Sequence, residues 1–228
     1  KEEKFTMKLK KIASLMLAGV MAVSMMTACS GKSADDTEEK PPVVDPVDDT
    51  FAASVNDLLS TEQKNVITFT NDATLNGVLA KVAPTIDSWN LMTFNMGAGH
   101  VFVTDAQDMR HLLGIDRNNS MVFGRLFSDK ATSVTKAADI FVVDGSYTEE
   151  GVAEFVAKYV KHLIQNKNMP VVGEKGVPYR YAYTGSIACT KVTNLSGDFE
   201  SYVVAFTMTQ TPTKVTNNNN GCSDGLPA

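Results

Sequence analysis

The sequence predicts an α+β fold, with a mostly antiparallel sheet, a long amphipathic helix packed on one face, and a C-terminal β-hairpin. Apolar residues between Val152 and Ile164 recur at spacings of three and four, which is typical of one helix face. Two runs of alternating apolar and polar residues follow, at 179–184 and 202–208, as expected for paired strands. The earlier elements lack the regular βαβ alternation that a doubly wound parallel sheet requires.

Size and charge set the first limits on function. The chain has 228 residues with 43% apolar content, which suits one buried core rather than two large domains. Its 21 Lys and Arg residues are outnumbered by 26 acidic residues and are scattered along the chain. No basic stripe is formed, so the composition does not favour a nucleic-acid partner.

The N-terminal region has the pattern of an export signal. Lys8, Lys10 and Lys11 precede an uncharged, mainly apolar stretch of 15 residues, from Ile12 to Met26. This stretch is shorter than the roughly 20 residues that a permanent membrane-spanning helix needs. Residues 1–28 are therefore predicted to be a signal peptide that is removed.

The residues at the end of this stretch, Met26, Thr27, Ala28 and Cys29, resemble the lipobox of bacterial lipoproteins. Met26 departs from the Leu or other aliphatic residue that the family prefers. The resemblance implies cleavage before Cys29, attachment of diacylglycerol to its thiol, and a position on the outer face of the bacterial cell membrane. Two acyl chains are enough for stable anchoring. The alternative is a simple signal peptide that ends beside an ordinary cysteine.

An acidic, proline-containing segment follows Cys29. Between residues 30 and 50 there are seven acidic residues, two lysines and three prolines. Charge repulsion and low hydrophobicity oppose collapse, so residues 29–50 are predicted to be a lipidated tether. Residues 51–211 form a single predicted α+β domain. The tail at 212–228, which contains four consecutive asparagines, is predicted to be disordered.

Local signals place the elements of this domain in order. Asp72 is expected to cap a helix that ends before Pro84. Thr104 and Gln107 have capping-box spacing before a short helix that ends near Gly114, with Arg110 pointing outward. Further strands are predicted from β-prone runs at 66–70, 89–94, 101–103, 121–123 and 140–143.

The long helix and the hairpin complete the predicted domain. The helix is expected from about Thr148 to Asn166, with Ser146 and Glu149 as its capping box. The two hairpin strands are joined through a predicted turn at 194–198. Together these elements give the helix a sheet on which to pack.

Chemistry-bearing motifs are scarce. The sequence contains no phosphate-binding glycine loop, no paired CxxC, no HExxH and no GxSxG. Candidate metal or acid-base residues are confined to one short stretch: His100, Asp105, Asp108 and His111. The alternative is that these side chains are ordinary polar residues on a solvated helix. No cofactor is expected.

A row of tyrosines offers a second candidate site. Tyr179, Tyr181 and Tyr183 share one face of a predicted strand, which suits glycan, peptidoglycan or protein recognition. Cross-strand packing is the alternative. Cys189 and Cys222 either pair or leave Cys189 as a buried thiol, and the sequence leaves this open.

Two functions follow as hypotheses. The anchor, the tether and the missing catalytic motifs favour a membrane-anchored, non-catalytic binding or interaction domain. The alternative is an extracellular hydrolase that acts on cell-wall or dietary polymers through the His100 to His111 stretch. A ligand-capturing importer subunit ranks below both, because the domain is short for two lobes.

Overall fold

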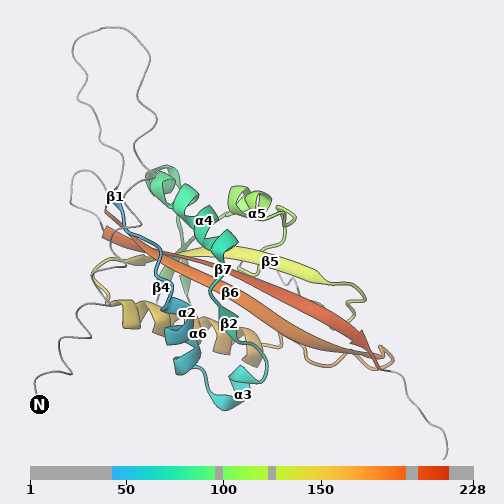
Figure 1. Cartoon of the computed structure of the whole chain (residues 1–228). Helices are drawn as coiled ribbons and strands as arrows, with labels where there is room; N and C mark the ends of the chain where they lie inside the picture. The colour runs from blue at the N-terminus through green and yellow to red at the C-terminus, as the bar shows by residue number, and fades with distance from the viewer. Residues whose placement is uncertain (1–42, 96–99, 123–126, 194–199, 216–228) are drawn as a thin grey trace, which may run out of the picture. The chain divides into compact units, whose positions relative to one another are not determined.

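The computed structural model describes residues 43–95, 100–122, 127–193 and 200–215. Its secondary structure agrees with the α+β prediction (Figure 1). The N-terminal half contains β1 (Val43–Val44), α2 (Phe51–Leu58), α3 (Thr61–Lys64), β2 (Phe69–Thr70), α4 (Ala73–Val82), the 3₁₀ helix η1 (Ala83–Ser88), β3 (Met92–Asn95), β4 (His100–Thr104) and α5 (Gln107–Leu112). The C-terminal half contains β5 (Thr135–Asp144), α6 (Glu149–Gln165), β6 (Tyr179–Thr193) and β7 (Glu200–Lys214).

The strands form one sheet in the order β1-β6-β7-β5-β4-β3, in which every neighbouring pair is antiparallel. The short β2 adds to β6 in parallel. The predicted C-terminal hairpin is confirmed, since β6 and β7 pair along their full 15 residues. The turn predicted to join them, at 194–198, lies outside the described residues.

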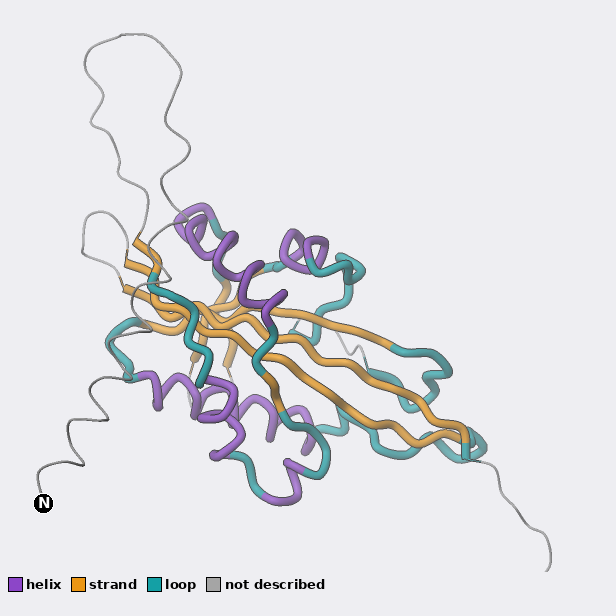
Figure 2. Tube along the Cα trace, viewed as in Figure 1, coloured by secondary structure: helices purple, strands orange, loops and turns teal. Residues whose placement is uncertain are grey.

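The long helix α6 packs on one face of the sheet, as predicted, and α4 and α5 cover the other face (Figure 2). Strand β5 is buried on both of its faces. Phe141 and Val143 pack toward α2 and α6, and Ile140 and Val142 pack toward α4 and α5. A central strand buried on both sides reads as a continuous apolar run rather than an alternating one.

The predicted long helix is confirmed as α6, but its predicted capping box is wrong. Thr148 caps the helix, and its Oγ1 accepts a hydrogen bond from the backbone N–H of Gly151 at 3.1 Å. Ser146 instead donates its N–H to Asp144 Oδ1 at 2.8 Å in the preceding turn. The cap therefore lies directly before the helix, where an N-cap side chain can reach the first free N–H groups.

The cap of α4 is confirmed and that of α5 is not. Asp72 Oδ1 accepts the N–H of Leu75 at 2.8 Å. Thr104 is still part of β4, where it pairs with Ile140, so it cannot cap α5. Ala106 occupies the N-cap position, and Gln107 donates its side-chain amide to Asp105 at 2.7 Å.

Other strand predictions are partly confirmed. β5 begins at Thr135, five residues before the predicted run. Met121 and Val122 are not in a strand, and residue 123 lies outside the described ranges. The segment before them follows the edge of β5 that β4 does not reach, with Ala138 N–H donating to Asn119 O at 3.3 Å. It covers backbone groups that would otherwise be an open edge.

The folded unit extends past both predicted boundaries. Residues 43–48, assigned to the tether, lie along β6: Val44 pairs with Val192, and Asp48 N–H donates to Cys189 O at 3.0 Å. At the other end, β7 continues to Lys214 rather than stopping before Pro212. We call residues 43–50 the edge strap.

Candidate functional site

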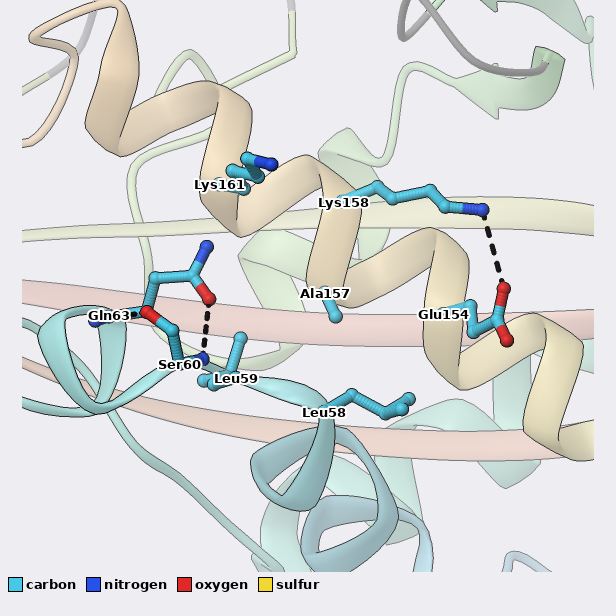
Figure 3. Close-up of a pocket in the computed structure, with 8 residues that line it drawn as sticks. All are labelled: Leu58, Leu59, Ser60, Gln63, Glu154, Ala157, Lys158 and Lys161. Atoms are coloured by element: carbon cyan, nitrogen blue, oxygen red, sulfur yellow. Dashed lines mark hydrogen bonds and ion pairs between the residues drawn. The ribbon is translucent and has the colours of Figure 1, made fainter.

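A groove of about 500 Å³ lies between α6 and the corner where α2 turns into α3 (Figure 3). Both sides contribute apolar and polar groups. The lining residues are Leu58, Leu59, Ser60, Gln63, Glu154, Ala157, Lys158 and Lys161.

The α2–α3 corner is fixed by local hydrogen bonds. Ser60 Oγ accepts the N–H of Gln63 at 3.3 Å, and Gln63 Oε1 accepts the N–H of Ser60 at 2.7 Å (Figure 3). This reciprocal capping box starts α3 directly after α2. The Ser-x-x-Gln spacing was visible in the sequence and could have predicted the turn.

The apolar wall of the groove comes from the same corner. Leu59 is buried against the core, whereas Leu58 is 47% exposed and lies at the groove. Ala157 on α6 faces them with its small side chain (Figure 3). An exposed leucine beside a hollow is apolar area that a ligand can cover.

The opposite wall carries a net positive charge. Lys158 Nζ pairs with Glu154 Oε2 at 3.3 Å, which is i, i+4 spacing on α6. Lys161 lines the groove one turn further along, and among the described residues it forms no ion pair. Two lysines and one glutamate leave one uncompensated cation beside the leucines.

The groove lining combines few kinds of polar group. Its one hydroxyl, on Ser60, donates to Glu62 Oε2 at 2.8 Å. The lining contains no histidine and no cysteine. It does offer an ammonium group, an amide and a hydroxyl next to apolar surface. Such a mixture holds and orients a ligand that has both apolar and anionic parts.

Two of the sequence-predicted metal or acid-base residues, Asp105 and Asp108, pair with different arginines. Asp105 Oδ1 pairs with Arg110 Nη2 at 2.6 Å, so its carboxylate is already neutralised. Asp108 lies 4.0 Å from Arg117, and His111 is exposed in the last turn of α5. His100 is the first residue of β4, and its side chain is outside the described set. No cluster of three metal-ligand residues occurs in the part of the chain that the structure describes.

The tyrosine row does not form an exposed surface. Tyr181 and Tyr183 are each 6% exposed and belong to the core beneath α6. Their hydroxyls donate to Asp129 O and Pro170 O, both at 2.7 Å. Only Tyr179 stays half-buried. The packing interpretation therefore describes Tyr181 and Tyr183.

A buried charge cluster was missed by the sequence reasoning, which placed Arg110 outside. Arg110 is 1% exposed and donates to Ala138 O and Asp139 Oδ1, at 3.0 and 3.3 Å. Asp139 also accepts from Ser120 Oγ and from the N–H of Met121, both at 2.6 Å. Burial raises the pKa of Asp139 to about 6, against these hydrogen bonds and Arg110. An isolated Asp inside an apolar run was the available signal for such a partner.

Cys189 is a buried free thiol, and Cys222 lies outside the described residues. Burial raises the pKa of the Cys189 thiol, and the nearby Glu149 and Asp48 add to the shift. A protonated, covered thiol is a poor nucleophile. Cys189 therefore acts as core packing beneath the edge strap.

Comparison with family models, curated proteins and solved structures finds no match to this chain. In the described part of the chain, no helix combines the length and apolar content needed to cross a bilayer.

Proposed function

We propose that this protein is a membrane-anchored, extracytoplasmic lipoprotein whose folded part is a non-catalytic binding domain. The lipobox-like sequence ending at Cys29 supports the anchor, and the acidic residues after it support a spacer. The groove between the α2–α3 corner and α6 supports the binding role. Lipidation of Cys29 would hold that groove close to the outer face of the cell membrane.

The groove's ligand, in this proposal, is an amphipathic anion. Leu58, Leu59 and Ala157 offer apolar contact to an aliphatic segment, while the uncompensated ammonium of Lys161 attracts a carboxylate or phosphate. The single observation that carries the proposal is this free cation beside an exposed leucine. A neutral apolar ligand would leave Lys161 unused, and a cationic one would be repelled.

Two amphiphiles that share one alkyl chain test this assignment. Dodecanoate and dodecyltrimethylammonium are titrated below their micelle concentrations, with binding followed by calorimetry and by amide shifts in α6. We expect dodecanoate alone to bind. Lys161→Gln should weaken it by about tenfold, the scale of one charge-assisted contact.

The matched control is Lys81→Gln, because Lys81 is also exposed but lies on α4. Equal binding of both amphiphiles, or equal weakening by the two lysine substitutions, would contradict the groove assignment. The anchor is tested separately by mass spectrometry of protein from bacteria, with Cys29→Ser as control. A mature N-terminus at Cys29 with acyl groups is expected, and an unmodified N-terminus elsewhere would contradict it.

A further inference from the structure

A second surface lies on the other side of the sheet, where β6 and β7 extend past α4 and α5 (Figure 1). Alternate residues of β7 place four threonines on this side: Thr207, Thr209, Thr211 and Thr213. Thr211 and Thr213 are exposed, and Thr207 and Thr209 are half-buried. Among the described residues, no helix covers this end of the face, so four consecutive outward positions remain at least partly accessible.

The strand register extends this row sideways. Thr184 pairs with Thr209, and Ser186 pairs with Thr207, so β6 adds two hydroxyls on the same face. Neighbouring hydroxyls are separated by about 6.8 Å along a strand and about 4.8 Å between strands. We call these six residues the hydroxyl face: Thr184, Ser186, Thr207, Thr209, Thr211 and Thr213.

Two cations border the hydroxyl face. Lys136 on β5 pairs with Thr209, and Arg180 on β6 pairs with Thr213. Both side chains are exposed, and neither forms an ion pair among the described residues. The outward positions of β6 and β7 on this face contain no acidic residue. With the carboxylate of Asp72 lining the cavity at the inner end, the two cations leave this surface with one net positive charge, in a chain whose net charge is −5.

The inner end of the face is hollowed by a cavity of about 280 Å³. Its lining joins sheet hydroxyls to the start of α4 and the end of α5: Asp72, Thr74, Leu75, Leu113, Ile115, Lys136, Ser186, Thr207 and Thr209. The carboxylate of Asp72 already accepts the N–H of Leu75 as a helix cap. Lys136 is thus the cation that a ligand in this cavity would meet.

We propose that the hydroxyl face binds an acidic polysaccharide, with one sugar unit in the cavity and the chain lying across the threonines. A hydroxyl both donates and accepts hydrogen bonds, which matches sugar hydroxyls. Lys136 and Arg180 match carboxylates or sulfates on the same chain. Two cations are too few for the phosphate density of a nucleic acid, where several neutralised phosphates supply the affinity.

Thr→Val substitutions test the hydroxyls without disturbing the sheet, since valine has the shape of threonine and favours strands. Wild-type protein is expected to bind polygalacturonate more tightly than the neutral glucan dextran, measured by affinity electrophoresis. Thr209→Val with Thr211→Val should weaken polygalacturonate binding by about tenfold, as expected for two hydrogen bonds. Lys136→Gln should weaken it and flatten its salt dependence.

Thr93→Val is the matched control, because Thr93 is an exposed strand threonine on β3, which is separated from β7 by β5 and β4. It should bind like the wild type, and so should Lys161→Gln, which separates this surface from the groove. Absent polygalacturonate binding, equal dextran binding, or full binding by the valine variant with an unchanged unfolding temperature would each overturn the proposal.

Discussion

Arg110 and Asp139 show how one ion pair joins three parts of the chain. Arg110 lies on α5, and its side chain is buried. Its guanidinium donates to Arg117 O, to Ala138 O and to the carboxylates of Asp105 and Asp139. Asp139 ties Ser120 and Met121 to the sheet from the other side. Removing one member would leave buried polar groups without partners, which costs more than the intact pair contributes.

The pH dependence of stability tests this cluster. The pKa of Asp139 rises from 3.8 to about 6 on folding, so the native state favours its protonated form. The contribution to the free energy of unfolding is therefore largest below pH 4 and is lost as pH rises through 6. We expect a loss of up to about 3 kcal/mol, since one pKa unit corresponds to roughly 1.4 kcal/mol.

Asp139→Asn removes this titration. Urea unfolding between pH 4 and 7 should show a smaller fall in stability for the variant than for the wild type, although the variant is less stable at pH 4.5. Asp144→Asn is the control, because Asp144 is exposed and hydrogen bonds from Ser146 lower its pKa. A wild-type slope in Asp139→Asn would show that other groups carry the dependence.

At the scale of elements, local sequence patterns predicted the helices and strands that depend on local interactions. The spacing of Val152 to Ile164 gave α6, the alternation at 179–184 and 202–208 gave the hairpin, and Asp72 gave the start of α4. The capping boxes predicted for α5 and α6 are wrong because the same residue spacing also fits a strand end or a tight turn. A spacing of three residues does not identify the N-cap, because the first of the two residues can still belong to the preceding strand or turn.

Long-range contacts were beyond local patterns. Arg110 looks like a surface residue until the segment at 115–122 folds over it. The acidic composition of residues 43–50 favours a tether, yet three backbone pairs hold them to β6. The groove needs α2 and α6, almost 100 residues apart, to lie side by side. Nothing in the periodicity of either helix fixes its partner.

The edge strap carries an acid pair that should make it sensitive to pH. Asp48 hydrogen-bonds to Glu149, the first residue of α6. This hydrogen bond raises the pKa of Glu149 to about 7, while hydrogen bonds from Glu149 and Thr50 lower that of Asp48, outweighing its desolvation. Below about pH 7 Glu149 therefore keeps the proton that the pair shares. Above pH 7 the two carboxylates repel each other.

Amide hydrogen exchange measures how firmly the edge strap is held at each pH. Because folding raises the pKa of Glu149 from 4.5 to about 7, its contribution to holding the strap is full below about pH 4.5 and is lost as pH rises through 7. Protection factors for the Asp45 and Asp48 amides, which bond to Lys191 O and Cys189 O, should fall severalfold from pH 6 to 8. In Glu149→Gln, which keeps a donor at all pH values, they should stay level. Equal falls in both proteins would assign the effect to another group.

For the whole molecule, the central question is where the folded unit begins. Composition places the boundary at Phe51, whereas the sheet begins at Val43. Val44 and Val47 pack on the α4 side, and Phe51 is buried on the α6 side. The strap therefore crosses the sheet edge and closes both cores, so the first part of the predicted tether is structural.

Two fragments test this boundary, one spanning residues 43–215 and one spanning residues 51–215. The shorter fragment loses the partial burial of Val44 and Val47 and the backbone pairing of the strap with β6, so its free energy of unfolding should be about 2–4 kcal/mol lower. Urea unfolding measures that difference directly.

Cys189 provides an independent reading of the same change. It is the one cysteine in both fragments, and its backbone carbonyl bonds to Asp48 of the strap. With the strap removed, a thiol reagent should modify Cys189 severalfold faster under native conditions, because local opening exposes it. Equal stability and equal reactivity of the two fragments would return the boundary to Phe51. A lower stability with unchanged reactivity would instead place the strap's contribution in Val44 and Val47, on the side of the sheet away from the thiol.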